Sequence, residues 1–401
     1  MKILLLCNKS PFPPKEGGPM AMHAILTGLL DTGHQVKILA FSTNKFPVSE
    51  VPETLQKDFE TVAINLKINP LNALFNLFTK KSLHIVRFYK EKMTRKLVAL
   101  LSSETFDIIQ LESVFMASYI GAIRQNSDAK IILRAHNVES LIWDRMAFQY
   151  KNPMKKWYIK LLGKRLKKYE TGVISRVDGI VPISKVDMGY FTDPDYQTPM
   201  ISIPFSINTE KFRDMTYGAP EPLSFFHIGS MDWIPNQEGI RWFLGNVWHK
   251  IHKKNPQACF YLAGRNMPEW LKRLQQPGVV VVGEVEDALT FIRTKSVLIV
   301  PLLSGSGIRI KIIEGMACMR TVLTTSIGAE GIEYSDNKNI LIANTPNDFI
   351  EKAQKLIDNP TMCEEIGKAA HHLIMNNYDT KKVVVNLMDF YQSCITKQDS
   401  K

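Results

Sequence analysis

Short apolar runs alternate with helical segments along this chain, and the alternation occurs twice. Continuous apolar runs of this length are typical of strands that are buried on both faces of a sheet. The candidate strands are 2–7, 35–41, 108–111, 130–133 and 179–183, and then 223–228, 258–262, 279–282, 297–300 and 321–323. Strands that alternate with helices predict parallel sheets with crossover connections, and therefore an α/β protein.

A segment rich in proline and glycine, between residues 199 and 222, interrupts this alternation. Because the pattern starts again after it, we interpret the segment as a linker between two Rossmann-like, doubly wound domains. The length of 401 residues is appropriate for two or three domains. We place the first domain at 1–205 and the second at 206–378, and we expect a final helix at 379–396 to pack back on the first domain.

Cysteine usage and hydropathy exclude several classes of protein. The five cysteines are scattered and form no CxxC pair, which argues against a disulfide framework and a zinc site. The apolar run at 3–7 is too short for a signal peptide, and no apolar stretch approaches the roughly 20 residues of a membrane span. We therefore expect a cytoplasmic protein whose only membrane contact is peripheral.

The positive charge is concentrated in the first half of the chain. Residues 1–205 hold 28 Lys and Arg against 18 Asp and Glu, which accounts for +10 of the total net charge of +11. Two expected helices, 83–101 and 153–175, are strongly basic, and Trp157, Leu161 and Leu162 can share one face of the second. Such helices suit anionic lipid headgroups, although a solvated scaffold helix explains the same pattern. The sequence contains no motif for recognition of nucleic acid, so we expect no nucleic-acid partner.

The segment 300–318 combines the features of an anion site. An expected strand ends at its start, a Ser/Gly loop comes next, and an expected helix begins near Arg309. Ligands of open α/β sheets bind beyond the carboxyl ends of strands, and a helix N-terminus attracts phosphate. Gly307 lets the backbone approach a ligand, Arg309 and Lys311 add positive charge, and Glu314 can accept sugar hydroxyls. We expect Arg309 and Glu314 at a solvent-reachable loop–helix junction; the alternative is an ordinary βα turn.

This segment resembles the signature of the retaining glycosyltransferase family 4, which has the GT-B fold of two Rossmann-like domains facing a central cleft. Members carry Glu-x7-Glu before Met-Ala, and Glu314-Gly-Met-Ala317 matches the second glutamate and the Met-Ala pair after it. Ser306 stands where the first glutamate is expected, and there the sequence departs from the pattern. The run Gly305–Lys311 is similar to the Gly-Ser-Gly-x-Arg-x-Lys form of related branches.

Other segments resemble parts of the family in the same order along nearly the whole chain. They are 9–18, 134–139, 203–212, 227–236, 263–265 and 326–331. Gly17 and Gly18 lie in the part that resembles the acceptor-side glycine loop, and His136 in the part that resembles the acceptor-side histidine loop. Arg265 comes after a strand where such enzymes place cations near the diphosphate. A plain turn, a core histidine and a surface arginine are the respective alternatives.

The resemblance implies transfer of a sugar, with retention, from a nucleoside diphosphate sugar to a glycan or lipid-linked acceptor, in the synthesis of cell-envelope or other polysaccharides. It implies no metal and no cofactor besides the donor, and Asp193-Pro-Asp195 reads as a turn, not a metal ligand set. Arg265, Arg309 and Lys311 would stabilise the diphosphate together with Ser306 and Gly307. Glu314 would hold the ribose, and His136 would orient the reacting sugar, so that His136 and Glu314 are the catalytic candidates. A GT-B nucleotide-sugar 2-epimerase and a non-catalytic nucleotide-sugar or glycan binding protein are the alternatives.

Overall fold

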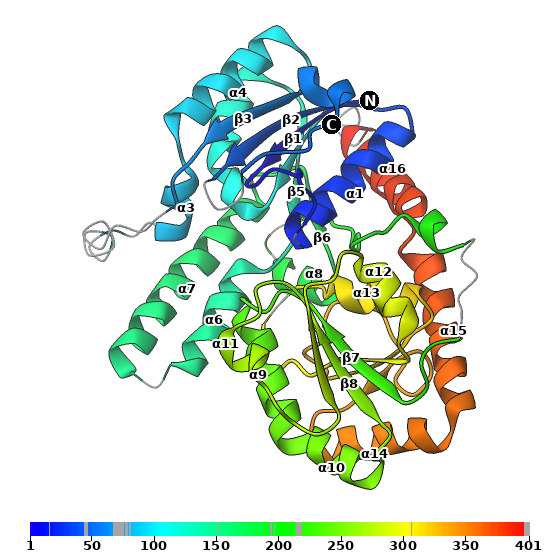
Figure 1. Cartoon of the computed structure of the whole chain (residues 1–401). Helices are drawn as coiled ribbons and strands as arrows, with labels where there is room; N and C mark the ends of the chain where they lie inside the picture. The colour runs from blue at the N-terminus through cyan, green and yellow to red at the C-terminus, as the bar shows by residue number, and fades with distance from the viewer. Residues whose placement is uncertain are drawn as a thin grey trace. The chain divides into compact units, whose positions relative to one another are not determined.

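The computed structural model describes residues 1–15, 17–43, 47–66, 76, 79, 82–150, 152–192, 195, 197–213, 219–305 and 307–396. Ser306 and Asp193 lie outside the described residues, and so does part of the expected linker. The chain divides into two compact units, of which the first comprises Met1–Ser206 and Thr380–Lys401 and the second Ile207–Asp379. Both units are α/β, as the sequence predicts (Figure 1).

The first unit contains a six-stranded parallel sheet in the order β3-β2-β1-β4-β5-β6. Its strands are β1 (Lys2–Cys7), β2 (Gln35–Ser42), β3 (Phe59–Ala63), β4 (Ile108–Glu112), β5 (Lys130–Ala135) and β6 (Gly179–Pro182). The four central strands β2, β1, β4 and β5 are rich in Ile, Leu and Val because helices cover both faces of the sheet.

Helices α1 (Gly17–Asp31) and α16 (Thr380–Thr396) cover one face of this sheet (Figure 1). A methyl group added at Gly28 would lie 2.6 Å from the side chain of Val384, so the two helices approach closely. The other helices are α3 (Leu83–Phe88), α4 (Glu91–Ser103), α5 (Ile120–Asn126), α6 (Glu139–Gln149), α7 (Pro153–Ile174) and α8 (Lys185–Phe191). The single helix expected at 83–101 is wrong, because the chain is extended at Tyr89 and Lys90, between α3 and α4.

The second unit repeats the plan with the strand order β12-β11-β10-β7-β8-β9. Its strands are β7 (Ser224–Ile228), β8 (Cys259–Ala263), β9 (Val279–Gly283), β10 (Val297–Val300), β11 (Thr321–Thr324) and β12 (Leu341–Ile342). Its helices are α9 (Ile234–Phe243), α10 (His249–Lys254), α11 (Glu269–Lys272), α12 (Ala288–Thr294), α13 (Ile310–Ala317), α14 (Pro346–Asp358) and α15 (Pro360–Asn377), with a π-helical turn at Leu244–Trp248. Aromatic side chains fill the core on one face; Phe243 and Phe260 lie 5.0 Å apart between ring centroids.

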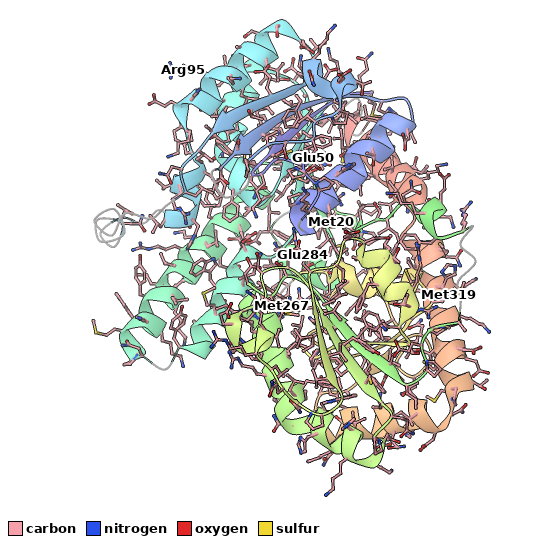
Figure 2. All side chains as sticks on the ribbon, viewed as in Figure 1. Met20, Glu50, Arg95, Met267, Glu284 and Met319 are labelled. Carbon is pink, nitrogen blue, oxygen red and sulfur yellow. The ribbon has the colours of Figure 1, made fainter. Side chains whose placement is uncertain are left out.

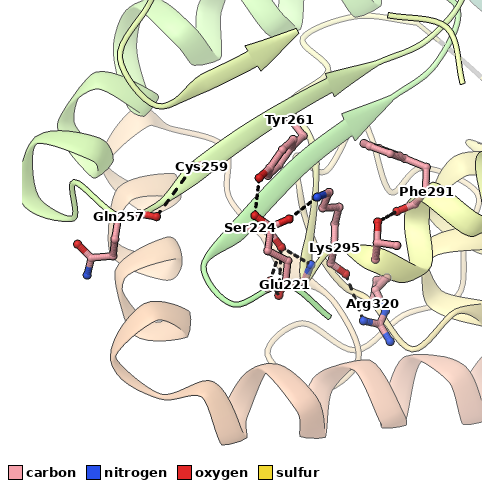
Figure 3. Close-up of polar contacts among 10 residues, drawn as sticks. Glu221, Ser224, Gln257, Cys259, Tyr261, Phe291, Lys295 and Arg320 are labelled. Atoms are coloured by element: carbon pink, nitrogen blue, oxygen red, sulfur yellow. Dashed lines mark hydrogen bonds and ion pairs between the residues drawn. The ribbon is translucent and has the colours of Figure 1, made fainter. Parts of the chain in front are cut away.

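A polar cluster joins strands near the amino ends of β7 and β10. Glu221 accepts hydrogen bonds from the Tyr261 hydroxyl and the Lys295 ammonium group (Figure 3). Lys295 also lies 3.7 Å from the centroid of the Tyr261 ring. Glu221 and Lys295 precede β7 and β10, so the cluster is at the edge opposite the carboxyl ends and serves to join strands.

Each sheet has one point at which the strand order reverses. The reversal lies between β1 and β4 in the first unit and between β7 and β10 in the second. Ligands of open α/β sheets bind beyond the carboxyl ends of the strands at such points. Two regions of the molecule are therefore candidates for a site, one in each unit.

Candidate functional site

Lys311 occupies the reversal point of the second sheet. It is the second residue of α13, and its Nζ donates to Asn236 Oδ1 at 3.1 Å and lies 3.1 Å from His227 Nε2. His227 is fully buried on β7, and its Nδ1 lies 2.7 Å from the carbonyl oxygen of Ile299 on β10. A carbonyl oxygen only accepts, so Nδ1 carries the proton and Nε2 accepts from Lys311. The ammonium group is thus anchored to β7, α9 and, through His227, to β10.

The pKa values of two side chains of α13, Lys311 and Glu314, are shifted close to neutral pH. Burial and, to a smaller extent, the charge of Arg309 lower the pKa of Lys311 to about 7, although the charge of Glu314 opposes the shift. Burial likewise raises the pKa of Glu314 to about 7, against the effect of Lys311. Perturbed groups of this kind are common at ligand sites, since a charged ligand can restore the ionised state.

Arg309 lies at the N-cap position of α13 and is 6% exposed, so the expectation that it is solvent-reachable is wrong. Its guanidinium group turns back on its own loop, where it donates to the carbonyl oxygen of Gly307 and lies 5.2 Å from the centroid of the Trp233 ring. Gly305 and Gly307 have φ angles of 114° and 82°, which side chains rarely adopt. The loop therefore requires glycine at both positions to enclose the guanidinium group.

Glycine also lets the loops after β7 and β8 meet. A Cβ atom at Gly264, whose φ is 146°, would collide with the carbonyl oxygen of Gly229. Arg265 comes directly after it, partly buried, and its carbonyl oxygen accepts from the Met231 amide at 2.8 Å. Arg265 thus lies at the same carboxyl edge of the sheet as α13.

A hollow of about 470 Å³ opens at the ends of β8 and β9, in the size range of small-molecule sites. Met267 and Glu284 come from the loops after these two strands (Figure 2). The lining residues are Gly264, Asn266, Met267, Lys272, Val281, Val282, Gly283 and Glu284. The sequence pattern does not predict this hollow; its only local signal is the Ala-Gly pair at the end of β8.

The first unit places His136 at the carboxyl end of its own sheet, directly after β5. Its Nε2 lies 2.5 Å from Oε2 of Glu112, the last residue of β4, whose side chain is fully buried. The sequence predicts a role for His136 but not for Glu112. A carboxylate at the end of a fully buried strand was the available signal.

Gly17 and Gly18 form the first turn of α1, so the expected glycine loop is wrong at these positions. The helix begins earlier than expected because both glycines adopt its conformation. A Cβ atom at Gly18 would meet no other atom within 4 Å, so neither packing nor backbone geometry requires glycine there.

Of the predicted site residues, Gly307, Arg309, Lys311 and Glu314 share one loop and helix, and Arg265 lies at the same edge of the second sheet. His136, Gly17 and Gly18 belong to the first unit. The residues predicted from the sequence thus divide into one group on each sheet.

Helix α7 presents an exposed apolar tip. Met154 and Trp157 are 79% and 61% exposed, whereas Leu162 is 4% exposed and packs inside the unit. Trp157 and Leu162 therefore do not share a face, because five residues of an α-helix correspond to a rotation of about 140°. In the part of the chain that the structure describes, no helix is long and apolar enough to cross a membrane.

Two doubly wound sheets, with an anchored ammonium group at the reversal point of the second, define a class of α/β protein suited to a phosphorylated ligand. Residues 222–359 match the family model of Glycosyl transferases group 1. The fold of the whole chain is similar to that of Anabaena HepE solved with UDP, with a TM-score of 0.69, 13% identity, and coverage of 98% of this chain and 100% of HepE. HepE has also been solved with UDP-glucose. The second unit therefore matches the group 1 glycosyltransferases, and the chain as a whole has the GT-B fold, as the sequence predicts.

Two relatives match by sequence. An uncharacterized 44.6 kDa protein in the cps region of Klebsiella pneumoniae is 24% identical over 397 residues, covering 95% of this chain and 97% of the relative. An uncharacterized glycosyltransferase of Methanocaldococcus jannaschii is 24% identical over 303 residues, covering 73% of this chain and 77% of the relative. The similarity to the first relative thus extends over both units.

Proposed function

We propose that the protein transfers a sugar, with retention of the anomeric configuration and without a metal ion, from a nucleoside diphosphate sugar to a hydroxyl group of an acceptor. The observation that carries this proposal is the anchoring of Lys311 by His227 and Asn236 at the reversal point of the second sheet. The UDP and UDP-glucose bound to HepE support a uridine diphosphate sugar as the first donor to test.

The diphosphate would bind at the amino end of α13. The side chain of the N-cap residue Arg309 makes no capping hydrogen bond, so an anion would accept from the N–H groups of Ile310 and Lys311. Lys311, Arg309 and Arg265 would add the positive charge that stabilises the departing diphosphate. Gly307 would let the loop approach the phosphates closely.

Glu314 and the hollow at β8 and β9 would hold the nucleoside. A carboxylate can accept hydrogen bonds from both hydroxyls of a ribose. The negative charge of a diphosphate beside Lys311 would favour its ammonium form, and that cation would in turn favour the ionised form of Glu314. The hollow lies at the same carboxyl edge, and its Val281 and Met267 offer apolar surface to a base. Donor binding would thus use residues of the second unit alone.

The acceptor would bind at the carboxyl edge of the first sheet, with His136 as the residue that contacts the reacting hydroxyl groups. Gly18 leaves open space at the first turn of α1, where a glycan or the headgroup of a lipid-linked acceptor can approach. The Klebsiella relative in the cps region supports a role in polysaccharide synthesis.

We also propose that α7 brings the protein to anionic lipid. Lys155, Lys160 and Lys164 are exposed around the apolar tip formed by Met154 and Trp157. Lysines beside exposed aromatic and apolar side chains favour the surface of an anionic bilayer.

The decisive experiment is a thermal-shift screen of nucleotide sugars, and then turnover of the best donor with glycan and lipid-linked acceptors. A donor that binds only the folded state raises the unfolding temperature. We expect a sugar–acceptor product that keeps the donor's anomeric configuration, formed equally well in EDTA. Free epimerised sugar would identify an epimerase, binding without turnover a binding protein, and loss of activity in EDTA a metal-dependent enzyme.

A further inference from the structure

Three adjacent strands of the first sheet place polar residues in one row near their carboxyl ends. Cys7 on β1 pairs in register with Glu112 on β4, and Glu112 pairs in register with Arg134 on β5. The side chains of Glu112 and Arg134 are 0% exposed, with Arg134 Nε 3.9 Å from Glu112 Oε2. A charged row is therefore buried beneath the edge where His136 lies.

Both oxygens of the Glu112 carboxylate accept hydrogen bonds. Gln110 Nε2 donates to Oε1 at 2.5 Å, and His136 Nε2 lies 2.5 Å from Oε2. Burial pushes the pKa of Glu112 upward, but the hydrogen bonds from His136 and Gln110 and the charge of Arg134 hold it below its usual value. The carboxylate is therefore ionised and acts only as an acceptor.

Arg134 supplies charge without occupying these oxygens. No residue in the described part of the chain accepts a hydrogen bond from its guanidinium group. The opposite charges of Arg134 and Glu112 favour each other in the interior, while the carboxylate lone pairs remain directed at Gln110 and His136. The Tyr391 hydroxyl completes the chain of contacts by donating to Gln110 Oε1.

Stability alone is a weak reason to bury such a group, because buried ion pairs often contribute little compared with apolar residues of similar size. The backbone provides a second indication. Ser113, directly after Glu112, has a φ of 120°, a conformation that non-glycine residues rarely adopt and that often occurs near functional groups.

We infer that Glu112 is a positioning residue that holds His136 in one orientation and one tautomer. Since the ionised carboxylate only accepts, the neutral imidazole carries its proton on Nε2 and leaves Nδ1 as an acceptor. Nδ1 then accepts a hydrogen bond from a substrate hydroxyl group. The role of Nδ1 rests on the proposed sugar transfer, whereas the tautomer does not.

A double-mutant cycle tests whether Glu112 acts through His136. We expect Glu112→Gln to lower kcat/KM about ten- to a hundredfold in the wild-type background and less than twofold in the His136→Ala background. An equal loss in both backgrounds would show a merely structural role and overturn the inference. Glu112→Gln leaves Arg134 without a charged partner. If this variant unfolds, the double variant Glu112→Leu/Arg134→Met, which buries neither of these two charges, takes the place of Glu112→Gln in the same cycle.

The tautomer is measured without activity, by ¹⁵N NMR of the full-length protein labelled at histidine. The His136 signals are assigned by their loss in His136→Ala. We expect a protonated Nε2 and a bare Nδ1 in the wild type, and a mixture of both neutral tautomers in Glu112→Leu/Arg134→Met. A proton on Nδ1 in the neutral wild-type ring would overturn the inference, whereas absent sugar transfer with the expected tautomer would overturn only the proposed function.

Discussion

Lys311 shows how neutral side chains can hold a cation inside a protein. Its contacts with His227 and Asn236 fix the position of the nitrogen but contribute no negative charge. The nearby carboxylate of Glu314 is itself destabilised as an anion, because burial raises its pKa. The free site is thus more positive at low pH than at high pH, and the donor diphosphate would supply the missing negative charge.

The pKa of about 7 for Lys311 predicts pH-dependent donor binding. The ammonium form is lost as the pH rises through 7, while the diphosphate diester of a nucleotide sugar keeps its charge. Affinity should therefore fall between pH 6 and 9, approaching about tenfold per pH unit at the upper end, as measured by calorimetry. Lys311→Met should bind weakly at every pH, whereas Lys355→Met, an exposed lysine paired with Glu351, should keep the wild-type profile. A flat wild-type profile would contradict this prediction.

Glu314→Gln should separate function from stability. The folded pKa of about 7 lies above the unfolded value, so stability from this group is present below about pH 4.5 and is lost as the pH rises through 7. At pH 8 the glutamine variant should therefore unfold at the same temperature as the wild type or higher, with this advantage absent at pH 4.5. Donor turnover should still fall about ten- to a hundredfold. A lower unfolding temperature for the variant at pH 8 would identify a structural carboxylate.

At the scale of single elements, a substitution in the first turn of α1 can distinguish an effect on stability from an effect on acceptor binding. Gly18→Ala meets no neighbouring atom and should raise the free energy of unfolding by up to about 1 kcal/mol. If the acceptor approaches this turn, the KM for the acceptor should rise while that for the donor is unchanged. Gly172→Ala on α7, where a Cβ atom also meets nothing, is the matched control and should leave both KM values unchanged. Unchanged acceptor kinetics in Gly18→Ala would place the acceptor elsewhere.

The tip of α7 predicts binding to anionic vesicles that decreases with salt. Each lysine near such a surface contributes about 1 kcal/mol, so Lys160→Gln/Lys164→Gln should weaken co-sedimentation at least about tenfold. Trp157→Ala should weaken it as well, whereas Tyr190→Ala, which removes an exposed ring of α8, should not. Equal binding to neutral and anionic vesicles, or none to either, would assign α7 a scaffold role.

The sequence predicts apolar strands better than polar or very short ones. The run Val297–Val300 is apolar throughout and is recognisable as a strand, whereas β3, with Glu60 and Thr61, and the two-residue β12 lie at sheet edges and carry no such signal. The same applies to the site. Arg309 and Lys311 belong to one short motif and can be recognised in the sequence. Their contact residues lie elsewhere in the chain, as His227 is 84 residues from Lys311. In the first unit, Glu112 is likewise 24 residues from its contact His136. Only the folded sheets bring these partners together.

At the scale of the whole molecule, the first unit is built from two separate stretches of chain. Helix α16 contributes Val383, Val384, Leu387 and Tyr391 to the apolar cluster that covers one face of the first sheet. The second unit has its own aromatic core and is continuous in sequence.

Removal of residues 380–401 should therefore unfold the first unit. Each buried apolar side chain is worth about 1.5–3 kcal/mol, so the loss of several approaches the total stability of a typical domain, about 5–15 kcal/mol. The fragment 207–379, in contrast, should unfold cooperatively and bind the donor. Circular dichroism and thermal unfolding of both proteins test this, and a truncated chain as stable as the full one would contradict it.

The return of α16 to the first unit also reverses the order in which the units are completed on the ribosome. Residues 1–206 emerge first, yet the face that α16 covers remains open until residues 380–396 are translated. At typical elongation rates the intervening stretch takes roughly 10 to 35 seconds, during which the second unit can fold completely. The amino-terminal unit is therefore finished after the second unit, and a nascent chain that stalls before residue 380 carries a complete second unit and an open apolar face on the first.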